Sequence, residues 1–385
     1  MKLGVNGIRL IGKRSGVGRA IEAILRCMSE MDQPFRDIVV YTPRPVDSDV
    51  ALPAMCRNVV LPSPMPYALW EQITLPRAHG SRDVLFCPSY VVPLAARCPT
   101  LLVHHGSYEG YPQAFGLWVR TKARAIYTLS ARRATTVSTV SQYSKQDMVR
   151  FYGLDPERIH VIPEGVDTRR FRPGIDGARL SAWRAATFGT DTPFIVYVGK
   201  PTERRNLSPL IRAFGLLKRE ERIPHKFLVV GADLPGTSPF RRVIEEERLG
   251  ADVVVRGYVQ HDEMVLVYNG ATALVYPSSY EGFGMPVLEA MACGTPVVTL
   301  DNTAFPEFAG GVALLLKNAD VHTLRDGIRA ILADPALRAR MAEAGPVRAA
   351  EYDWRRVTAA YVELLIQLAC QRATRPAMAQ PWRGR

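Results

Sequence analysis

Residues 273–298 read ALVYPSSYEGFGMPVLEAMACGTPVV and contain an apolar run, a glycine-rich loop, a helix-forming stretch and a second apolar run. The runs 273–276 and 296–299 are aliphatic and rich in valine, which indicates two buried strands. A strand, a helix and a strand in succession form a βαβ unit, and such units build parallel sheets. The glycine-rich loop then leaves the carboxyl end of a strand, where open α/β sheets bind ligands.

Two carboxylates, Glu281 and Glu289, lie eight positions apart around this loop. Gly282 and Gly284 lack side chains, so a ligand can approach the main chain there. Pro286 suits the first turn of a helix, whose free N–H groups would form a cradle for phosphate. Isolated glutamates are usually solvated surface charges. Here they flank the cradle as two hydroxyl acceptors, a layout that fits a nucleotide sugar.

Composition narrows the class of protein. The chain has 385 residues, 47% of them hydrophobic, which is enough for a large core and favours two domains. No apolar run reaches the ~18 residues that a membrane span needs, and the N-terminus lacks a signal segment, so we expect a cytoplasmic protein. The six cysteines lack paired C-x-x-C spacing, which favours buried free thiols over disulfides or zinc.

The formal net charge of +12 predicts an anionic partner. We find no nucleic-acid-binding motif, so we expect no nucleic acid. Residues 110–146 contain no Asp or Glu, and within 118–133 basic residues alternate with apolar ones on an expected helix. Two interpretations stay open. The helix either has one packed and one solvated face, or it makes a peripheral contact with anionic lipid at the inner face of the plasma membrane.

Strands and helices alternate through the chain in two series, which predicts two Rossmann-like domains of the α/β class. The expected strands are 3–6, 37–41, 83–86, 100–104, 135–138 and 158–162 in the first series, and 194–199, 227–231, 252–256, 273–276, 296–299 and 312–315 in the second. The turn-rich stretch 163–173 suits a domain junction. We expect domains at 1–170 and 171–353, a helix over 354–372 that crosses back to the first domain, and a disordered tail at 373–385.

A glycine-rich turn, Gly12-Lys-Arg-Ser-Gly-Val-Gly-Arg19, follows the first expected strand. It is no dinucleotide fingerprint, because Ile21 occupies the position of the third glycine. Gly16, Val17 and Gly18 can still form a phosphate or acceptor loop with their backbone N–H groups. A simple tight turn is the alternative.

Two more segments carry candidate side chains. His104 and His105 end a strand and point to opposite faces, so that one can face a ligand while the other supports it. The loop Gly199-Lys-Pro-Thr-Glu-Arg-Arg-Asn206 places three cations after a strand, which suits a diphosphate, although a solvated charge run is the alternative. Asp47-Ser-Asp49 has a metal-binding spacing, but it lies in a Pro-rich polar loop, and the cations make a metal unnecessary. We therefore expect no metal and no cofactor.

Together these segments resemble the family 4 retaining glycosyltransferases of the GT-B fold over nearly the whole chain. The E-x7-E segment from Glu281 to Glu289 is the most specific match. Supporting matches are Leu69-Trp-Glu-Gln72 with Leu75-Pro76, Cys87-Pro-Ser89, His104 with Pro112, Thr139-Val-Ser141 with Ser144-Lys145, Val161-Ile-Pro-Glu-Gly-Val-Asp167 and Tyr352-Asp-Trp354. The set is similar to a bacterial mannosyltransferase-type subgroup. The resemblance implies two Rossmann-like domains that face a deep interdomain cleft.

The resemblance also implies site roles. In the N-terminal, acceptor-binding domain, Gly16 lies near the phosphate and acceptor, and His104 approaches the transferred sugar. In the C-terminal, nucleotide-sugar-binding domain, Glu281 binds the sugar hydroxyls, and Arg205, where the family usually has Lys, neutralises the leaving diphosphate. The implied donor-binding residues are Lys200, Tyr258 near the base, Phe283, Gly284, Met285, Pro286, Val287, and Glu289 on the ribose.

The implied activity is retaining transfer of a hexose to a glycan or lipid-linked acceptor in cell-surface polysaccharide synthesis, with mannose from GDP-mannose as the favoured donor. Because no evident nucleophile is present, the acceptor would attack on the face from which the diphosphate leaves, and positive charge would stabilise that leaving group. Two alternatives stay open. They are a GT-B-type sugar-nucleotide epimerase, which needs no acceptor, and a non-catalytic sugar-nucleotide-binding protein.

Overall fold

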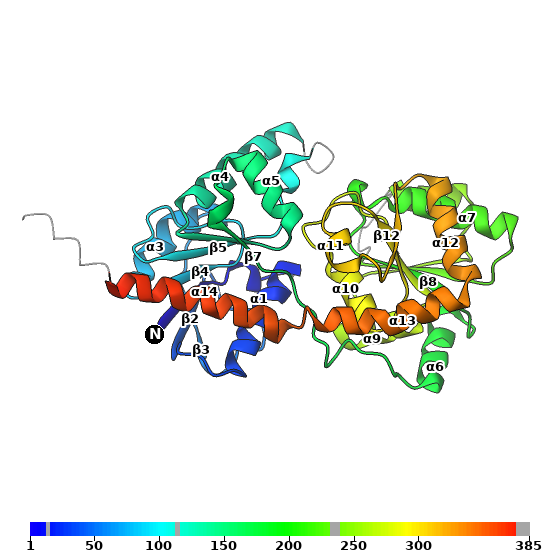
Figure 1. Cartoon of the computed structure of the whole chain (residues 1–385), viewed down its shortest axis with the longest axis horizontal. Helices are drawn as coiled ribbons and strands as arrows, with labels where there is room; N and C mark the ends of the chain where they lie inside the picture. Colours follow the sequence, from blue (N-terminus) through cyan, green and yellow to red (C-terminus); the bar gives the residue numbers. More distant parts are fainter. Residues whose placement is uncertain (13–15, 112–115, 232–238, 375–385) are drawn as a thin grey trace, which may run out of the picture.

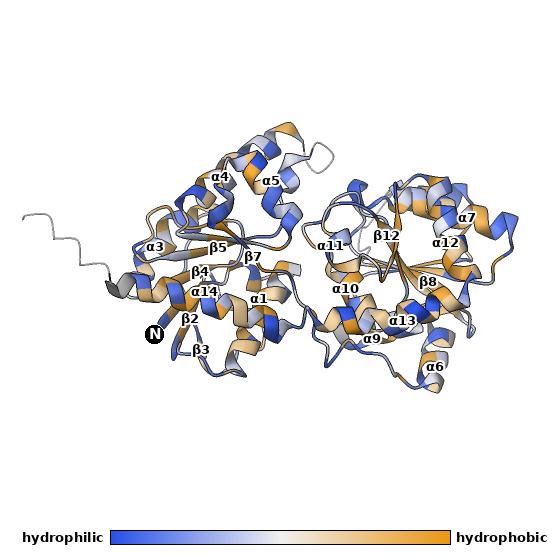
Figure 2. Ribbon diagram, viewed as in Figure 1, coloured by the Kyte–Doolittle hydropathy of each residue, from blue (hydrophilic) through white to orange (hydrophobic). Residues whose placement is uncertain are grey.

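The structure is a computed structural model that describes residues 1–12, 16–111, 116–231 and 239–374. Figure 1 shows two lobes side by side, each built around a parallel sheet with helices on its faces. Both sheets are strongly hydrophobic, whereas the helices carry mixed surfaces (Figure 2). Parallel strands that are covered on both faces need such continuous apolar runs, which is why the strands could be read from the sequence.

The N-terminal sheet has seven parallel strands in the order β3-β2-β1-β4-β5-β6-β7. The strands are β1 Lys2–Asn6, β2 Asp37–Thr42, β3 Cys56–Val60, β4 Val84–Cys87, β5 Thr100–His104, β6 Thr136–Thr139 and β7 Ile159–Val161. The main helices are α1 Gly16–Ser29, α2 Tyr67–Leu69, α3 Leu75–Ala78, α4 Leu117–Arg133 and α5 Gln142–Tyr152. Six strands confirm the expected ones. The sequence did not predict β3, an edge strand of only partly buried residues.

The C-terminal sheet has six parallel strands in the order β10-β9-β8-β11-β12-β13. The strands are β8 Phe194–Val198, β9 Lys226–Val230, β10 Val253–Arg256, β11 Ala273–Tyr276, β12 Val297–Leu300 and β13 Leu314–Leu316. The helices are α6 Gly177–Phe188, α7 Leu207–Glu220, α8 Pro239–Glu246, α9 His261–Gly270, α10 Met285–Ala292, α11 Phe305–Ala309, α12 Val321–Ala333 and α13 Pro335–Ala350. All six expected strands of this series are confirmed.

The last helix, α14 Trp354–Thr374, crosses from the C-terminal lobe to the N-terminal one (Figure 1). Its buried residues Trp354, Val357 and Tyr361 join the same hydrophobic core as α1 and β1. The crossing helix is therefore confirmed, and it runs two residues past the expected end at 372. Residues 375–385 of the expected tail lie outside the described residues.

Two further expectations concern helices and cysteines. None of the helices in the described ranges combines the length and hydropathy that a bilayer span needs. All six cysteines are free thiols; four of them are buried, as expected, whereas Cys56 is half-buried and Cys370 is exposed.

Candidate active site

Both sheets reverse their direction of growth once, between β1 and β4 in the first lobe and between β8 and β11 in the second. Ligands bind at such switch points in open α/β sheets, beyond the carboxyl ends of the strands. In the second lobe, residues 199–206 leave β8 and residues 277–284 leave β11. The cationic loop and the first part of the E-x7-E segment are therefore neighbours because of the topology.

The loop after β11 directly contacts the loop after β5 of the other lobe. A Cβ atom on Gly282 would lie 2.0 Å from the carbonyl oxygen of His105, and one on Gly106 would lie 2.9 Å from Cα of Gly282. Gly106 also has a φ of +116°, which strains other residues. The Ser141 hydroxyl donates to the Gly282 carbonyl over 2.8 Å. Only glycine at these positions permits so close an approach of the two lobes.

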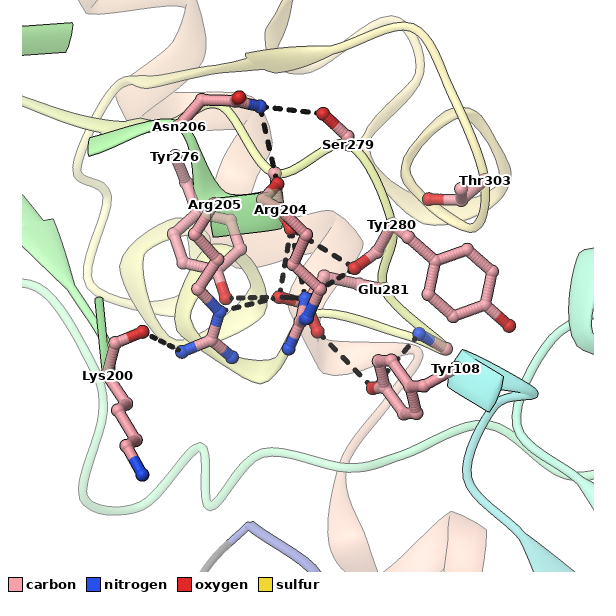
Figure 3. Close-up of polar contacts among 12 residues, drawn as sticks. Tyr108, Lys200, Arg204, Arg205, Asn206, Tyr276, Ser279, Tyr280, Glu281 and Thr303 are labelled. Atoms are coloured by element: carbon pink, nitrogen blue, oxygen red, sulfur yellow. Dashed lines mark hydrogen bonds and ion pairs between the residues drawn. The ribbon is translucent and has the colours of Figure 1, made fainter. Parts of the chain in front are cut away.

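Glu281 is almost fully buried at this contact, where it pairs with two arginines (Figure 3). Its Oε1 lies 2.6 Å from Nη1 of Arg204 and 2.9 Å from Nε of Arg205. Burial alone would raise the pKa of Glu281, but the charges of Arg205 and Arg204 lower it to about 2. The carboxylate is therefore ionised, and it can accept hydrogen bonds from hydroxyl groups but cannot act as an acid.

Three hydroxyl groups complete the surroundings of this carboxylate. Tyr276 donates to Oε1 over 2.7 Å and Ser278 over 3.1 Å, while Tyr108 from the other lobe donates to Oε2 over 3.4 Å. The guanidinium of Arg204 lies 4.8 Å from the centre of the Tyr108 ring, a cation–π distance. Oε1 therefore carries four hydrogen bonds, whereas Oε2 has one long contact.

Gly199 makes room for the second arginine. A Cβ atom on Gly199, whose φ is +141°, would lie 2.5 Å from Nη1 of Arg205. That nitrogen donates to the Lys200 carbonyl over 3.2 Å, and the guanidinium lies 5.6 Å from the centre of the Tyr276 ring. A glycine at the end of β8 thus lets an arginine six residues later fold back towards Glu281.

Tyr280, which precedes Glu281, forms hydrogen bonds between the two lobes. Its hydroxyl donates to Oδ2 of Asp147 on α5 over 2.8 Å and accepts from the Ser107 N–H over 2.7 Å. The same carboxylate accepts from the Tyr111 hydroxyl over 2.9 Å. At the start of α5, the N–H groups of residues 142 and 143 donate to the Glu307 carboxylate of the other lobe, which suits the positive end of a helix dipole.

Glu289 is a buried residue of α10, the helix that follows the loop of Glu281. Tyr268 donates to its Oε2 over 2.8 Å, and Nη1 of Arg19 on α1 approaches Oε1 to 3.9 Å. Burial raises the pKa of Glu289, while the charge of Arg19 and the hydrogen bond from Tyr268 oppose that shift. The second carboxylate thus also faces a residue of the N-terminal lobe.

The start of α10 meets the glycine-rich turn of the first lobe. Gly284 precedes the helix with a φ of +114°, and Pro286 lies in the first turn, as expected. A Cβ atom on Gly16 would lie 2.6 Å from Cε of Met285. The backbone N–H groups that open α10 therefore lie next to the start of α1.

Comparison with known proteins places this geometry in a family. Residues 14–170 match the family model "Glycosyltransferase Family 4", and residues 182–348 match "Glycosyl transferases group 1". The chain belongs to these glycosyltransferases. Solved glycosyltransferase-type structures align over nearly its full length, which confirms the predicted GT-B fold with two Rossmann-like domains.

Two curated relatives of this family 4 glycosyltransferase are mannosyltransferases. The O-antigen chain mannosyltransferase B of Escherichia coli is 28% identical over 225 residues, 58% of either chain. The MMP alpha-(1->4)-mannosyltransferase of Mycolicibacterium hassiacum is 30% identical over 233 residues, 60% of this chain and 53% of the relative. The alignments thus span little more than half the length of these relatives.

Two solved structures share the fold at low identity. HepE from Anabaena, in complex with UDP and glucose, aligns with a TM-score of 0.79 and 19% identity over 96% of this chain and 100% of its own. WaaG, a glycosyltransferase involved in lipopolysaccharide biosynthesis, aligns with a TM-score of 0.72 and 17% identity over 94% of this chain and 99% of its own. Such similarity shows the shared architecture.

The expected orientation of His104 differs from the one in the structure. The side chain is fully buried, with Nε2 at 2.9 Å from the Tyr152 hydroxyl and the ring packed edge-on against Tyr90 and Tyr127. Burial and the neighbouring His105 lower the pKa of His104 to about 3. In this conformation the contacts of the imidazole in the described part of the chain are with tyrosines of its own lobe, and none of them is with the Glu281 cluster.

The other candidates of the glycosyltransferase divide into two groups. The side chains of Phe283 and Val287 are buried, and Phe283 stacks on Phe308 at 4.5 Å, so these positions can offer a ligand only their backbone. Tyr258 is 59% exposed in the loop after β10, and the Lys200 ammonium points away from Glu281 (Figure 3). Val17 and Gly18 lie in the first turn of α1.

A few motif residues lie elsewhere. Residues 13–15 of the glycine-rich turn and Pro112 lie outside the described residues. Asp47 accepts from the Gly12 N–H over 2.5 Å and pairs with Arg44 at 3.1 Å, so it stabilises a loop of the N-terminal lobe.

Sequence reasoning missed several residues that the structure brings to Glu281. Arg204 lies in the cationic loop, from which the sequence predicted only Lys200 and Arg205 as site residues. Tyr108 and Tyr276 carried no signal, because they come from separate elements and no spacing connects them with Glu281. The one signal in the sequence is the number of tyrosines near the two loops, at positions 108, 111, 276 and 280, which indicates a site rich in hydroxyl groups.

Proposed function

We propose that the protein is a retaining glycosyltransferase that moves a hexose from a nucleotide diphosphate sugar to a glycan or lipid-linked acceptor. The observation that carries the proposal is the buried, ionised Glu281 between Arg204 and Arg205, at the switch point of one lobe and against the other. Membership of the glycosyltransferase families supports the reaction class. A carboxylate for sugar hydroxyls and guanidinium groups for a diphosphate are the groups that this substrate needs.

The pairing of these groups suggests how a donor would bind. Both guanidinium groups point at Glu281, as Figure 3 shows. A donor would offer phosphate oxygens to Arg205 and sugar hydroxyls to the Glu281 carboxylate. The guanidinium group and the carboxylate would then each replace part of their mutual contact with a contact to the donor. The free N–H groups at the start of α10 would add positive dipole ends for the diphosphate. Glu289 would accept the ribose hydroxyls.

The proposed transfer needs no protein nucleophile. The bond between the anomeric carbon and the phosphate oxygen breaks, and the acceptor oxygen forms its bond to the same face of that carbon. The acceptor proton passes to the departing phosphate oxygen. Because negative charge grows on the diphosphate, the arginines stabilise the transition state more than the ground state.

A donor screen tests the proposal first. GDP-mannose is the favoured donor because the curated relatives include mannosyltransferases. A donor at 100 times its Kd should raise the unfolding free energy by about 2.7 kcal/mol, which a thermal-shift comparison of GDP-mannose, UDP-glucose and ADP-glucose detects. No stabilisation by any of them would contradict the proposal.

Turnover assays then separate the three candidate functions. A transferase releases nucleotide in proportion to added acceptor, an epimerase converts the donor sugar without acceptor, and a binding protein does neither. We expect Arg205→Ala to lower kcat by about a hundredfold or more, because one charge-stabilising donor is lost. The matched control is Arg241→Ala, an exposed arginine on α8. Equal loss of activity in both variants would sink the role of Arg205.

We further propose that α4 brings the protein to the inner face of the plasma membrane, where a lipid-linked acceptor would lie. Trp118 is 79% exposed and Leu117 72%. Arg120, Arg124 and Arg133 donate to backbone carbonyl groups, so these contacts leave their positive charges uncompensated. An exposed apolar end beside uncompensated cations suits an anionic bilayer surface.

Vesicle sedimentation tests this membrane contact. Phosphatidylglycerol vesicles should retain the wild type and release a variant with Lys122→Glu and Trp118→Ser, whereas phosphatidylcholine vesicles should bind neither strongly. The charge-matched control is Arg242→Glu, which reverses one exposed arginine on α8. Equal release of the control and the α4 variant would show that only net charge matters.

A further inference from the structure

The Glu281 cluster leaves one group of polar and aromatic residues in the N-terminal lobe without a role. It consists of Arg9, Glu71, Tyr90 and Tyr127, which come from four different segments. Arg9 follows β1 and Tyr90 follows β4, so both lie at the switch point of the N-terminal sheet. Tyr127 lies on α4, and Glu71 lies in the π-helical turn Trp70–Thr74, a rare conformation that is frequent at functional sites.

Glu71 is a buried carboxylate that uses only part of its capacity. The residue is 7% exposed, and Oε1 accepts from the Asn6 side chain over 2.7 Å. Within the described chain, this is the hydrogen bond that the carboxylate makes. Burial raises the pKa of Glu71 to about 7, against the opposing effects of Asn6 and the charge of Arg9. Burying a carboxyl group costs free energy, and among the described residues Oε2 has no hydrogen-bond partner to offset that cost. This oxygen can therefore accept a hydrogen bond from a ligand hydroxyl.

Tyr90 and Tyr127 form an aromatic platform, and Tyr90 lies on the segment that faces this carboxylate's turn, since Gln72 donates to the Val92 carbonyl in the loop that also carries Tyr90. Their rings stack at 5.1 Å with an interplanar angle of 25°, and both residues remain partly exposed. Tyr90 adopts a φ of +60°, a left-handed conformation that costs energy for a residue other than glycine and is common at functional sites. Aromatic faces with polar rims pack well against the apolar faces of sugar rings.

Arg9 supplies the cationic side of the group. The residue is exposed, and its Nε donates to the Ser89 hydroxyl over 2.8 Å, which fixes the guanidinium at the edge of the sheet. Ser89, which accepts from Arg9, directly precedes Tyr90, and Asn6, which donates to Glu71, lies three residues before Arg9, so Arg9 lies between the carboxylate and the tyrosines. Its charge also lowers the pKa of Glu71. The planar fork leaves further N–H groups that can donate to sugar oxygens.

We propose that Arg9, Glu71, Tyr90 and Tyr127 bind the sugar ring of the acceptor, with a hydroxyl on Glu71 and the ring against the stacked tyrosines. The inference rests on the proposed glycosyl transfer and deepens it, since it identifies a glycan as the acceptor class. The Tyr90 ring lies 5.7 Å from the ring of His105, whose carbonyl oxygen contacts Gly282, so the group adjoins the loop that carries Glu281. Tyr127 lies on α4, the proposed membrane helix, so the glycan of a lipid-linked acceptor would reach this site while its lipid stays in the membrane.

Binding of simple glycosides tests the site without turnover. Saturation-transfer NMR of octyl α-D-mannopyranoside, with GDP present, should show enhanced sugar-ring protons on the wild type. Above the pKa of Glu71, which is about 7, Glu71→Gln should weaken that binding by about tenfold, the loss expected for one hydrogen bond to a charged group. Tyr127→Ala should weaken it by a similar factor, because the stacked ring is lost. Tyr127→Phe keeps the stacked ring and should bind like the wild type. Asp37→Asn removes a carboxylate at the opposite end of the sheet, paired with Arg82, and should also bind normally.

The outcomes separate this inference from the proposed function. Unchanged glycoside binding in Glu71→Gln and Tyr127→Ala, or no ring signal on the wild type, overturns the acceptor site. Nucleotide-sugar stabilisation and donor hydrolysis are measured on the same variants and should remain at wild-type level, because the donor residues are untouched. Absence of both in the wild type would instead remove the proposed transferase function.

Discussion

Glu281 is a buried carboxylate that balances two guanidinium groups, so we expect its replacement to affect stability as well as activity. Glu281→Gln leaves two buried cations without a counter-charge, and breaking such a pair costs about 3–5 kcal/mol. The effect has a defined pH dependence. The folded-state pKa of about 2 lies below the ordinary value of 4.5, so the stabilisation is present above 4.5 and is lost as the pH falls towards 2.

The measurement is chemical denaturation of wild type and Glu281→Gln across this range. We expect the difference in unfolding free energy to shrink as the pH falls from about 5 to about 2. Glu245→Gln on α8 is an exposed control and should show no such difference. A difference that stays constant with pH would mean that the ion pair does not cause it. Activity loss in Glu281 variants should therefore be compared at temperatures where they remain folded.

His104 gives a second prediction, about its tautomer. The Tyr152 hydroxyl has one proton and donates it to Glu109, so it must accept from the Nε2–H of His104. Nδ1 then lacks a proton, which agrees with its lack of a partner within the described chain. Because the folded-state pKa is about 3, we expect imidazole ¹⁵N shifts to report this neutral tautomer down to about pH 5. Protonation near pH 6.5 would contradict the buried placement.

At the residue scale, spacing predicted some partners and not others. Glu281 and Glu289 could be found because both belong to one loop and helix, whose geometry follows from the chain itself. Strand alternation gives His104 and His105 opposite faces, but it does not tell which face meets the other lobe. In the structure neither imidazole faces the Glu281 cluster, since His105 binds Glu164 at 2.6 Å. Long-range contacts such as Tyr280 with Asp147 have no local signature.

At the scale of elements, the contact between the loops after β5 and β11 depends on glycine. Gly282→Ala would place a methyl group 2.0 Å from a carbonyl oxygen, so the loops must separate. We expect a loss of transfer of about a hundredfold or more, because small misplacements of the reacting groups are costly. Nucleotide binding by the C-terminal lobe should persist. Gly177→Ala at the start of α6 is the matched control, since a Cβ atom there meets nothing within 4 Å.

Activity assays and small-angle scattering together test this prediction. A more open molecule with bound nucleotide and little transfer is the expected result for Gly282→Ala. Wild-type activity in that variant would mean that the contact between Gly106 and Gly282 is not needed for the reaction.

Buried elements were predicted better than exposed ones. The strands of both sheet centres are continuous apolar runs, such as Phe194–Val198, because both of their faces are covered. β3 reads Cys-Arg-Asn-Val-Val at the sheet edge, where one side lacks a neighbouring strand and polar residues are tolerated. The π-helical turn that carries Glu71 was missed for a different reason, since its sequence has no feature that separates it from an ordinary helix.

At the scale of the whole molecule, the two lobes are held by a few polar contacts and by one shared helix. These polar contacts are hydrogen bonds made by Tyr280, Ser141 and Glu307. Water can replace each protein partner in such a bond, so breaking them when the lobes separate costs little. Helix α14 is different, because its apolar residues complete the core of the N-terminal lobe although the chain reaches it last. The stability of the first lobe therefore depends on the end of the sequence.

Truncation before Trp354 tests that dependence. The buried side chains of α14 that would leave the core include Trp354, Val357, Tyr361, Leu365 and Leu368. Each buried side chain of this size contributes about 1.5–3 kcal/mol, so these five together are comparable to the roughly 5–15 kcal/mol by which proteins are stable. We expect the N-terminal lobe to unfold and the C-terminal lobe to keep its own core. Hydrogen exchange should then lose protection in β1 to β7 and retain it in β8 to β13.

Removal of residues 375–385 alone should leave both patterns intact, because these five side chains all precede that segment. Full protection of β1 after the longer truncation would mean that α14 only covers a core that is already complete.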